Sequence, residues 1–313
     1  MEDFSNKIVV VTGGAGFIGS HLVDALVERG AKVRVIDDLS TGKKENLAQV
    51  MDRIEFTQDS ILNPEALATV FAGADYVFHQ AAIPSVPRSV KDPMTSHNAN
   101  ATGSLCVLLA ARDAKVKRVV VAGSSSYYGD TPTLPKVETM PPNPLSPYAL
   151  QKFVAEKYAM MFYKLYGLET VIVRYFNIFG PRQDPNSPYS AVIPIFIKQM
   201  KAGIAPTVNG DGTASRGFTF IDDTVAANLA AAIAPNVGGE VFNVSGWEQT
   251  SINDLIAKIN ALLGTSIVPI YGPERLGDIK HSFADVSKAE RMLGWKPLIS
   301  FEEGLKRTAE SIE

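Results

Sequence analysis

A tyrosine and a lysine four positions apart, with a serine upstream, have the residue types of an acid/base centre. Tyr148 and Lys152 open a predicted helix over residues 148–166, and their spacing places both side chains on one helix face. A lysine ammonium near a phenol, with a second cationic group nearby, favours the phenolate and lowers the tyrosine pKa, which gives a general base near neutral pH. Ser124 follows a predicted strand over residues 118–122 and can hydrogen-bond the same substrate hydroxyl. Because this spacing alone more often marks a solvated helix face, the interpretation depends on the surrounding elements.

A glycine-rich segment at residues 7–20, KIVVVTGGAGFIGS, indicates how a second molecule is held. Its β-branched run predicts a strand buried on both faces, followed by a helix over residues 18–29. Gly13, Gly16 and Gly19 allow a tight turn and a close approach to a pyrophosphate at the helix N-terminus. The next predicted strand, 32–36, ends at Asp37, whose carboxylate can bind both ribose hydroxyls of an adenosine and would repel a 2′-phosphate. A tight strand–helix junction with a solvated aspartate is the alternative, but the order of these features favours a bound dinucleotide, and NAD over NADP.

Strands and helices alternate through the first half of the chain. Further strands are predicted at residues 54–57, 76–79 and 171–174, and further helices at 64–71 and 98–114. This alternation is typical of an α/β fold with a doubly wound parallel sheet, the Rossmann fold, whose ligands bind beyond the carboxyl ends of the strands. Asp38 begins a polar loop beside the expected adenosine. Gln80, Ala81 and Ala82 follow a strand, and the small residues among them leave room for a ligand.

The second half of the chain has a different sequence pattern. Prolines at 181, 185, 188, 194 and 206 interrupt the alternation, although helices are predicted at 222–234 and 252–263 and a strand at 240–244. We therefore expect an NAD-binding Rossmann domain at residues 1–176. Residues 177–313 are expected to form mainly a smaller α/β substrate lobe, with interleaved segments that return to the first domain.

The composition narrows the class of protein. The chain has 313 residues, of which 46% are hydrophobic and 20% charged, with a formal net charge of −3. This is ordinary globular composition without the basic footprint of nucleic-acid binding. The one cysteine, Cys106, excludes an internal disulfide and fits a reducing compartment. No signal peptide precedes Lys7, no apolar run has membrane-spanning length, and no cluster of metal ligands is evident. We expect a cytoplasmic protein with no metal, nucleic-acid or membrane partner.

Several longer motifs resemble one known family. They are TGGAGFIGS at 12–20, the segment NATG at 100–103, SSSYYGD at 124–130, SPYALQK at 146–152, RYFNIFGPRQDP at 174–185, NGDGTASRGFTFIDD at 209–223 and RLGDIKHSFADVSKAE at 275–290. Together they are highly specific and extend nearly to the C-terminus. The chain resembles the extended short-chain dehydrogenase/reductase family, and within it the nucleotide-sugar C4-epimerases.

This resemblance implies roles for individual residues. It makes Ser124 and Tyr148 the catalytic pair, with Lys152 beside them. With the residues already singled out by pattern, the expected NAD contacts are Gly13, Gly16, Phe17, Ile18, Gly19, Asp37, Asp38, Asp59, Ser60, Gln80, Ala81, Ala82, Asn100, Tyr148, Lys152 and Tyr175. The implied contacts to the sugar nucleotide are Ser85, Ser125, Ser126, Asn177, Val192, Asn209, Arg216, Arg275 and Asp278. Two arginines suit a diphosphate, because guanidinium groups make bidentate, charge-assisted hydrogen bonds; surface salt bridges are the alternative.

Two features bear on the reaction and the substrate. Sugar-nucleotide 4,6-dehydratases and UDP-glucuronate decarboxylases that resemble this chain carry an acidic residue where Ser125 and Ser126 stand, and serine is no general base unaided. A redox-neutral 4-epimerase needs only one acid/base pair and a retained NAD. Ser282 occupies a position where epimerases restricted to UDP-glucose and UDP-galactose have a tyrosine, and SVPRS at 85–89 resembles the N-acetyl-preferring subgroup.

We therefore predict an NAD-dependent UDP-hexose 4-epimerase that handles UDP-GlcNAc and UDP-GalNAc, with UDP-Glc and UDP-Gal as further candidates. A UDP-uronate 4-epimerase or decarboxylase remains an alternative. A non-enzymatic NAD-sensing protein is a second one, disfavoured by the intact Tyr148 and Lys152. The resemblance also implies a homodimer through a four-helix interface, formed by apolar faces along residues 107–111 and 153–162.

Overall fold

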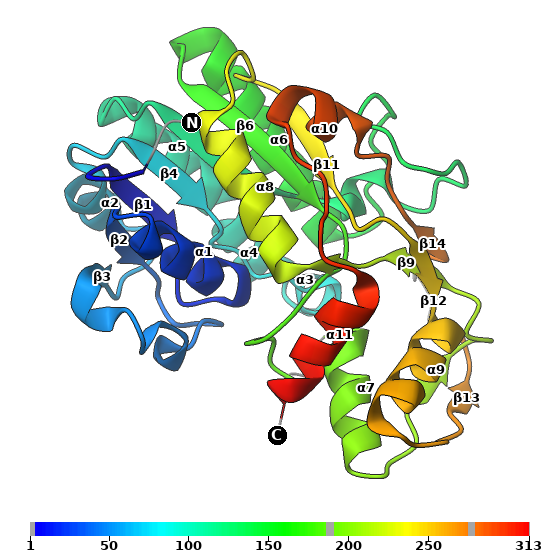
Figure 1. Ribbon diagram of the computed structural model, residues 1–313. Helices are drawn as coiled ribbons and strands as arrows, with labels where there is room; N and C mark the ends of the chain where they lie inside the picture. Colours follow the sequence, from blue (N-terminus) through cyan, green and yellow to red (C-terminus); the bar gives the residue numbers. More distant parts are fainter. Residues whose placement is uncertain (1–3, 186–190, 275–278, 313) are drawn as a thin grey trace.

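Seven parallel strands form the sheet at the centre of the molecule (Figure 1). The computed structural model describes residues 4–185, 191–274 and 279–312. Along the sheet the strands are β11 (Val241–Val244), β6 (Glu169–Tyr175), β5 (Arg118–Ser124), β4 (Tyr76–His79), β1 (Ile8–Thr12), β2 (Lys32–Ile36) and β3 (Ile54–Thr57). All neighbouring pairs are parallel. The predicted doubly wound α/β fold is thus confirmed.

The central strands are apolar on both faces. Val9, Val10 and Val11 of β1 have no exposed surface, and the middle residues of β6 are equally buried. A parallel strand covered by helices on both sides has no solvent face, so its sequence shows a continuous apolar run instead of alternation. This is why the strand at 76–79 could be predicted with the bounds that the structure gives it. The strands at 32–36 and 54–57 also have the predicted bounds, but they lie at one end of the sheet, where apolar and polar residues alternate.

Helices cover both faces of the sheet (Figure 1). On one face α1 (Phe17–Glu28) packs against α8 (Ile221–Ile233), and α8 contacts β5 and β6. On the other face lie α2 (Pro64–Phe71), α5 (Gly103–Asp113) and the long α6 (Pro147–Tyr166). Each face has its own hydrophobic core, and neighbouring residues of β1 such as Val9 and Val10 belong to different cores. The two cores fix the sheet between its helices.

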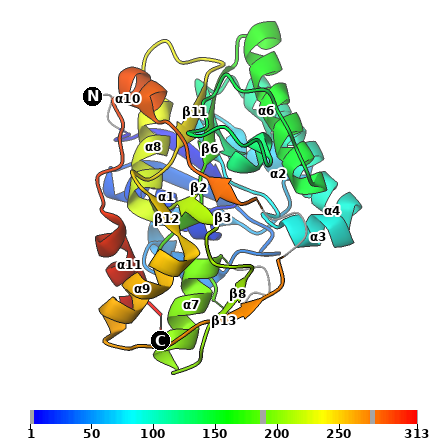
Figure 2. The same ribbon diagram turned by 90° about the vertical axis from the view of Figure 1, so that its right-hand side faces the viewer.

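The remaining helices of the second half gather beyond the sheet. α7 (Val192–Lys201), α9 (Ile252–Leu263) and α11 (Phe301–Glu310) contact one another and lie at the bottom of both views (Figures 1 and 2). Short strands connect them: β7 (Ile178–Phe179) with β10 (Thr219–Phe220), β12 (Gln249–Ser251) with β9 (Ser215–Gly217) and β14 (His281–Ser282), and β13 (Ile270–Gly272) with β8 (Thr207–Asn209). β11, α8 and α10 (Ser287–Leu293), which packs on β11, return to the main sheet. The division at residue 176 stays a prediction, because one hydrophobic core runs from β1 to α9.

Several short elements were not predicted. α3 (Val86–Lys91) and α4 (Pro93–His97) begin at the capping side chains of Ser85 and Asp92, and η1 (Lys44–Leu47), η2 (Met51–Arg53) and η4 (Ser125–Tyr128) are single 3₁₀ turns. The helix expected over residues 98–114 begins with a π-helical turn, η3 (Asn98–Thr102), before α5. Such turns occur often at functional sites, and here Asn100 points inward to bind the backbone of Ile83. Among the helices in the described ranges, none has the length and hydropathy to cross a membrane.

Replacing Gly19 by alanine should destabilise the junction between β1 and α1. A Cβ at Gly19 would lie 2.1 Å from the Gly13 carbonyl oxygen, which is backbone and cannot swing aside. We expect the free energy of unfolding in urea to fall by about 1–3 kcal/mol, with less NAD recovered from the purified protein. Gly272→Ala is the control, because its Cβ would meet only ordinary contacts, the nearest at 3.7 Å. Equal stability of the two variants would contradict this reading of the turn.

Candidate active site

A cavity of about 800 Å³ opens at the carboxyl edge of the sheet. Residues from the ends of β2, β4, β5 and β6 line it together with the β1–α1 turn and the start of α6. Of the residues predicted to bind NAD, its walls contain Gly13, Gly16, Phe17, Ile18, Gly19, Asp37, Asp38, Asp59, Ser60, Gln80, Ala81, Ala82, Tyr148, Lys152 and Tyr175. Asn100 does not reach the cavity but is buried behind it.

The β1–α1 turn has the form that a pyrophosphate requires. Gly13 has a φ of +69°, and a Cβ there would lie 2.6 Å from the backbone of Ala81. Gly16 stands at the N-cap of α1 and provides no side-chain cap, so the first turn of the helix keeps amide N–H groups for an anion. The chain thus presents a close-packed, donor-rich wall to this part of the cavity.

Asp37 is held ready to accept further hydrogen bonds. It is 7% exposed; Oδ2 accepts from the Ala15 amide at 2.9 Å, and Oδ1 accepts from the Leu39 amide at 2.8 Å. Burial raises the pKa of this carboxyl, while these two amide bonds oppose the shift. Asp59 is anchored in the same way, because its carboxylate accepts from the Ser60 amide and from the Asn63 side chain. A buried carboxylate at Asp37 and a half-buried one at Asp59, each with fixed orientation and spare lone pairs, fit the ribose hydroxyls of NAD.

The catalytic candidates meet where β5 ends and α6 begins. Ser146 caps α6, and the Tyr148 amide donates to Ser89 Oγ at 3.1 Å, which fixes the first turn of the helix. Lys152 is 7% exposed, and its Nζ donates to the carbonyl of Ala122, two residues before Ser124, at 3.0 Å. Burial lowers the pKa of Lys152 to about 8. The ammonium is therefore fixed next to the serine that ends β5.

Together, the protein's own residues do not lower the pKa of Tyr148, so the expected lowering depends on the nicotinamide cation. Burial raises this pKa, and a hydrogen bond with Ser124 opposes the shift. The lowering expected from Lys152 is not found, because desolvation dominates and the ammonium is directed at the Ala122 carbonyl. Further positive charge near the phenol is needed to favour the phenolate.

The serine run forms a compact turn. Ser124 Oγ lies 2.8 Å from Ser126 Oγ and accepts from the Ser126 amide at 3.2 Å. Ser124 and Ser125 line the cavity, whereas Ser126 is not among its lining residues. The Ser126 hydroxyl and amide thus orient the Ser124 hydroxyl, which forms a hydrogen bond with Tyr148.

Tyr175 forms a second polar group in the cavity wall. Its hydroxyl lies 2.8 Å from Asn228 Oδ1 and also contacts the Gln80 side chain. Burial raises the pKa of Tyr175, so it stays protonated and does not compete with Tyr148 as a base. Asn228 was missed by the sequence analysis. In the sequence it is a single amide among the alanines of a predicted helix. Helical periodicity gives no reason to assign a function to such a residue.

The residues implied for the sugar nucleotide are less concentrated. Ser125 and Asn177 line the cavity, but the other described candidates are not among its lining residues: Ser85, Ser126, Val192, Asn209, Arg216 and Ser282. Ser85 is buried as the N-cap of α3, and Val192 begins α7 next to the cavity-lining Ala191. Arg216 of β9 pairs in register with Ser282 of β14, and Asn209 ends β8. Arg275 and Asp278 lie outside the described residues.

Two cavity-lining arginines were also missed, Arg88 and Arg182. Arg88 lies in α3, directly before Ser89, whose hydroxyl binds the Tyr148 amide. Arg182 is fixed by an ion pair to Asp24 at 2.6 Å. Both lie inside motifs that carry the family resemblance, SVPRS at 85–89 and RYFNIFGPRQDP at 174–185, but only the folded chain shows that these arginines face the cavity. In the described part of the chain, no three His, Cys, Asp or Glu side chains gather in a way that could hold a metal ion.

Comparisons with known proteins agree with this geometry. The signature of the NAD dependent epimerase/dehydratase family matches residues 9–245. A UDP-glucose 4-epimerase of Mycolicibacterium smegmatis is 40% identical over 96% of this chain and 97% of its own length. The UDP-N-acetylglucosamine 4-epimerase of Methanobrevibacter ruminantium, solved with UDP-N-acetylmuramic acid, is 41% identical with a TM-score of 0.94 and 98% coverage of both chains. The UDP-glucuronic acid 4-epimerase of Bacillus cereus, solved with UDP-glucuronic acid and NAD, is 34% identical with a TM-score of 0.90, covering 97% of this chain and 98% of its own.

His79 makes stability depend on pH. It is fully buried between Thr12 and Ser104 hydroxyls, each 2.8 Å from a ring nitrogen, and burial lowers its pKa from 6.5 to about 3. Between these values the unfolded chain binds the extra proton, so stability falls as the pH drops below 6.5. Relative to His79→Gln, the protein should lose about 2 kcal/mol of unfolding free energy between pH 7 and pH 5.

Urea titrations at several pH values measure this difference. His97→Gln is the matched control, since His97 is exposed and its replacement leaves this pH dependence in place. Parallel stability profiles for the protein and His79→Gln would contradict the prediction.

Proposed function

We propose, from the premise that this chain belongs to the NAD dependent epimerase/dehydratase family, that it interconverts UDP-GlcNAc and UDP-GalNAc by inversion at C4. It is an NAD-dependent enzyme of the UDP-sugar 4-epimerase kind; the choice of sugar is the proposal, with UDP-Glc and UDP-Gal as additional substrates. The observation that carries the proposal is the placement of Ser124, Tyr148 and Lys152 in the wall of the cavity that the β1–α1 turn closes at its other end.

Each of these residues has one task in the reaction. When bound, NAD would accept the hydride from C4 of the sugar and later return it to the same carbon. Its positive charge would favour the Tyr148 phenolate. Tyr148 takes the proton from the C4 hydroxyl and gives it back after the 4-keto sugar has presented its other face. Ser124 hydrogen-bonds the same oxygen and holds it toward Tyr148. Lys152 lies on the same helix face as Tyr148, is held at the Ala122 carbonyl and adds its positive charge to that of NAD.

The surroundings of Ser124 support epimerisation over dehydration or decarboxylation. Its neighbours are Ser125 and Ser126, and the Ser126 hydroxyl is engaged with Ser124 at 2.8 Å. Among the described residues, the acids that line the cavity are Asp37, Asp38, Asp59 and Asp184, and none belongs to the serine turn. A second proton transfer at C5 or C6 has no carboxylate to perform it from that turn.

The preference for N-acetylated sugars rests on Ser282. It lies half-buried in β14, opposite Arg216 in the register with β9. Ser282 is not among the residues that line the cavity, and its assignment rests on the resemblance: its hydroxymethyl side chain fills less space than the tyrosine of epimerases restricted to UDP-glucose and UDP-galactose. The 2-acetamido group of the sugar is the substituent that we assign to this space.

A UDP-uronate 4-epimerase is the second candidate, and Arg88 favours it. This arginine lines the cavity on the helix that contacts Tyr148 through Ser89, where a carboxylate at C6 would find a cation. The same guanidinium suits the carbonyl oxygen of an acetamido group, so substrate assays are needed to separate the two.

We also propose a homodimer, but with a smaller interface surface than the sequence implied. Val107, Leu108 and Ala111 are core residues and are not available for an interface. Leu109 and Ala110 of the same expected face are half-buried. On α6, Leu150, Met161 and Leu165 are 50%, 49% and 64% exposed. These side chains are the candidates for burial against a second copy.

An NMR assay of the purified protein with UDP-GlcNAc, UDP-Glc or UDP-glucuronate, without added NAD, tests the proposed function. Conversion of UDP-GlcNAc to its C4 epimer is the expected result, and it requires NAD carried through purification. Conversion of UDP-Glc alone would contradict the sugar preference. Conversion of UDP-glucuronate alone would favour the second candidate, and release of carbon dioxide would contradict epimerisation.

Tyr148→Phe should abolish turnover without loss of NAD. Removal of the general base is expected to lower kcat about 10²–10⁴-fold, while the bound NAD, measured after denaturation, stays unchanged. Tyr158→Phe on the same helix is the control and should retain full activity. A Tyr148→Phe protein with near-normal kcat would contradict the mechanism.

Ser282→Tyr should change the choice of sugar. The ring is expected to fill the space assigned to the acetamido group and to lower kcat/KM for UDP-GlcNAc at least about 10-fold, with little change for UDP-Glc. Ser266→Tyr, at an exposed position, controls for the added ring. An equal loss for both substrates would argue against a role of Ser282 in specificity.

A further inference from the structure

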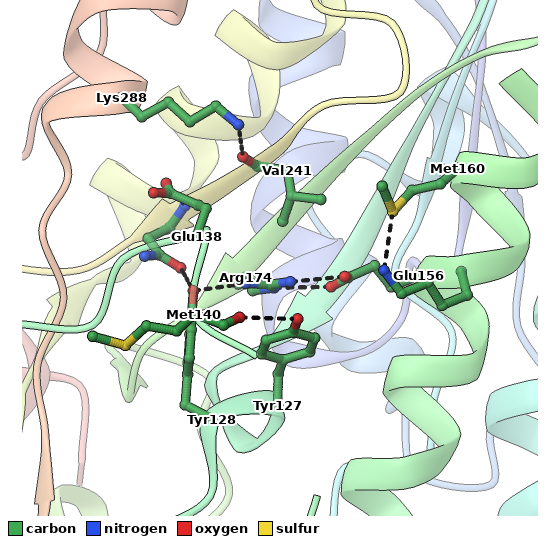
Figure 3. A network of polar contacts seen from close by, with 11 residues as sticks. Tyr127, Tyr128, Glu138, Met140, Glu156, Met160, Arg174, Val241 and Lys288 are labelled. Atoms are coloured by element: carbon green, nitrogen blue, oxygen red, sulfur yellow. Dashed lines mark hydrogen bonds and ion pairs between the residues drawn. The ribbon is translucent and has the colours of Figure 1, made fainter. Parts of the chain in front are cut away.

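An ion pair buried behind the catalytic residues has no role in the reaction described above (Figure 3). Arg174 and Glu156 are 2% and 3% exposed. Arg174 Nε donates to Glu156 Oε2 at 2.8 Å, and Nη2 donates to Oε1 at 2.7 Å, so the pair is bidentate. Taking two charges out of water is costly, and apolar residues of similar volume often serve stability as well or better. Its presence here therefore calls for a reason besides stability.

The pair joins the elements that carry the catalytic residues. Glu156 lies on α6 one turn after Lys152 and two turns after Tyr148, along the same helix stripe. Arg174 lies on β6 opposite Gly123 of β5, and the next residues, Tyr175 and Ser124, are also paired. The lack of a side chain at Gly123 makes room for the arginine, since a Cβ there would lie 3.1 Å from Arg174 Cγ.

Arg174 also holds the turn that follows Ser124. Its guanidinium carbon lies 3.5 Å from the ring centroid of Tyr127, a cation–π contact, and Nη1 donates to the Tyr128 hydroxyl at 2.7 Å (Figure 3). The Tyr128 hydroxyl in turn donates to Asn243 of β11 at 2.7 Å. The planar, five-donor guanidinium is the group that can contact helix, strand and turn at once.

Glu156 would have another partner if Arg174 did not bind it. A glutamate and a lysine four residues apart on a helix can form an ion pair, and Lys152 precedes Glu156 by four positions. In the structure Lys152 donates to Ala122 instead, and both carboxylate oxygens of Glu156 are bound by Arg174.

We propose that the Arg174–Glu156 pair positions the active site: it fixes Ser124 relative to Tyr148 and Lys152, and it keeps Glu156 from binding the Lys152 ammonium. The inference rests on the proposed function, and both residues are positioning residues because neither lines the cavity. The wild-type rate tests the proposed function, whereas the ratio of variant to wild-type rate tests the pair.

The decisive variant replaces the whole pair by apolar side chains, Arg174→Met with Glu156→Leu. Because no unpaired charge is left, it should fold with unchanged or higher stability. If the pair positions the catalytic groups, kcat should fall about 10- to 100-fold while KM for the UDP-sugar and the NAD content change little. A stable double variant with wild-type kcat would overturn the inference.

A second ion pair, which joins β5 to β6 and is more exposed, provides the control. Arg118 and Glu169 begin β5 and β6, pair in register and form a salt bridge at the strand ends away from the cavity. Arg118→Met with Glu169→Leu should leave kcat within about 2-fold of wild type. An equal loss of kcat from both double variants would overturn a specific role of Arg174 and Glu156.

Two single variants keep the test decisive if the double variant fails to fold. Arg174→Lys keeps a positive charge next to Glu156 but loses the bidentate hydrogen bonds of the guanidinium and the contact with Tyr128. We therefore expect kcat to fall while KM stays unchanged. Wild-type kcat in this variant would overturn the inference.

Glu156→Gln tests the electrostatic part through the pH profile of kcat. The charged or titratable groups around this part of α6 are Tyr148 and Lys152 on the helix, His79 from β4, Arg174 from β6, and Tyr127, Tyr128 and Glu138 beyond it. Without the Glu156 carboxylate, the positive charge of Arg174 is no longer neutralised, and it favours the Tyr148 phenolate. The acidic limb of the pH profile of kcat should therefore move to lower pH. An unmoved limb would contradict this part of the proposal.

Discussion

The active site depends on a lysine ammonium kept in a buried place. The charge of Lys152 can stabilise a Tyr148 phenolate only if the ammonium is close to it and shielded from water. The same burial, however, lowers the pKa of Lys152 to about 8. The protein compensates with one fixed acceptor, the Ala122 carbonyl at the end of β5, and commits the nearest helix carboxylate, Glu156, to Arg174. Each of these contacts requires β5, β6 and α6 to keep one relative placement. The long apolar strands and the two cores on either side of the sheet provide it.

The two ends of the cavity are built by different means. At the dinucleotide end, backbone groups make most of the contacts. Gly13 packs closely against Ala81, and Asp37 accepts hydrogen bonds from amides of its own turn and of the β1–α1 turn. At the catalytic end, side chains from separate elements converge, with Ser124 from β5, Tyr148 and Lys152 from α6 and Tyr175 from β6. Arg88 reaches the same cavity from α3, which is tied to α6 through Ser89.

This difference explains how far the sequence could predict the molecule. The parallel sheet, the glycine turn, Asp37 and the Tyr148–Lys152 pair all have local patterns, because buried strands are continuously apolar and helix spacing is fixed. Asn228 has no such pattern, and the SVPRS motif does not show where Arg88 points; packing between distant segments brings Arg88 to the cavity and Asn228 to Tyr175 in its wall. The π-helical turn before α5 depends on Asn100 binding the backbone of Ile83, a contact across 17 positions that periodicity does not include. That burial raises the pKa of Tyr148 could not be predicted for the same reason, since burial is a property of the fold.

Transfer of the C4 hydrogen within one active site is the central claim, and an isotope label tests it most directly. UDP-GlcNAc carrying deuterium at C4 would be incubated in ordinary water with the purified protein and no added NAD, and both epimers analysed by NMR and mass spectrometry. Deuterium should stay at C4 in substrate and product, because the hydrogen leaves and returns as hydride while Tyr148 exchanges only the hydroxyl proton. Loss of deuterium to the solvent during epimerisation would show proton abstraction from carbon and would rule out hydride transfer to and from NAD.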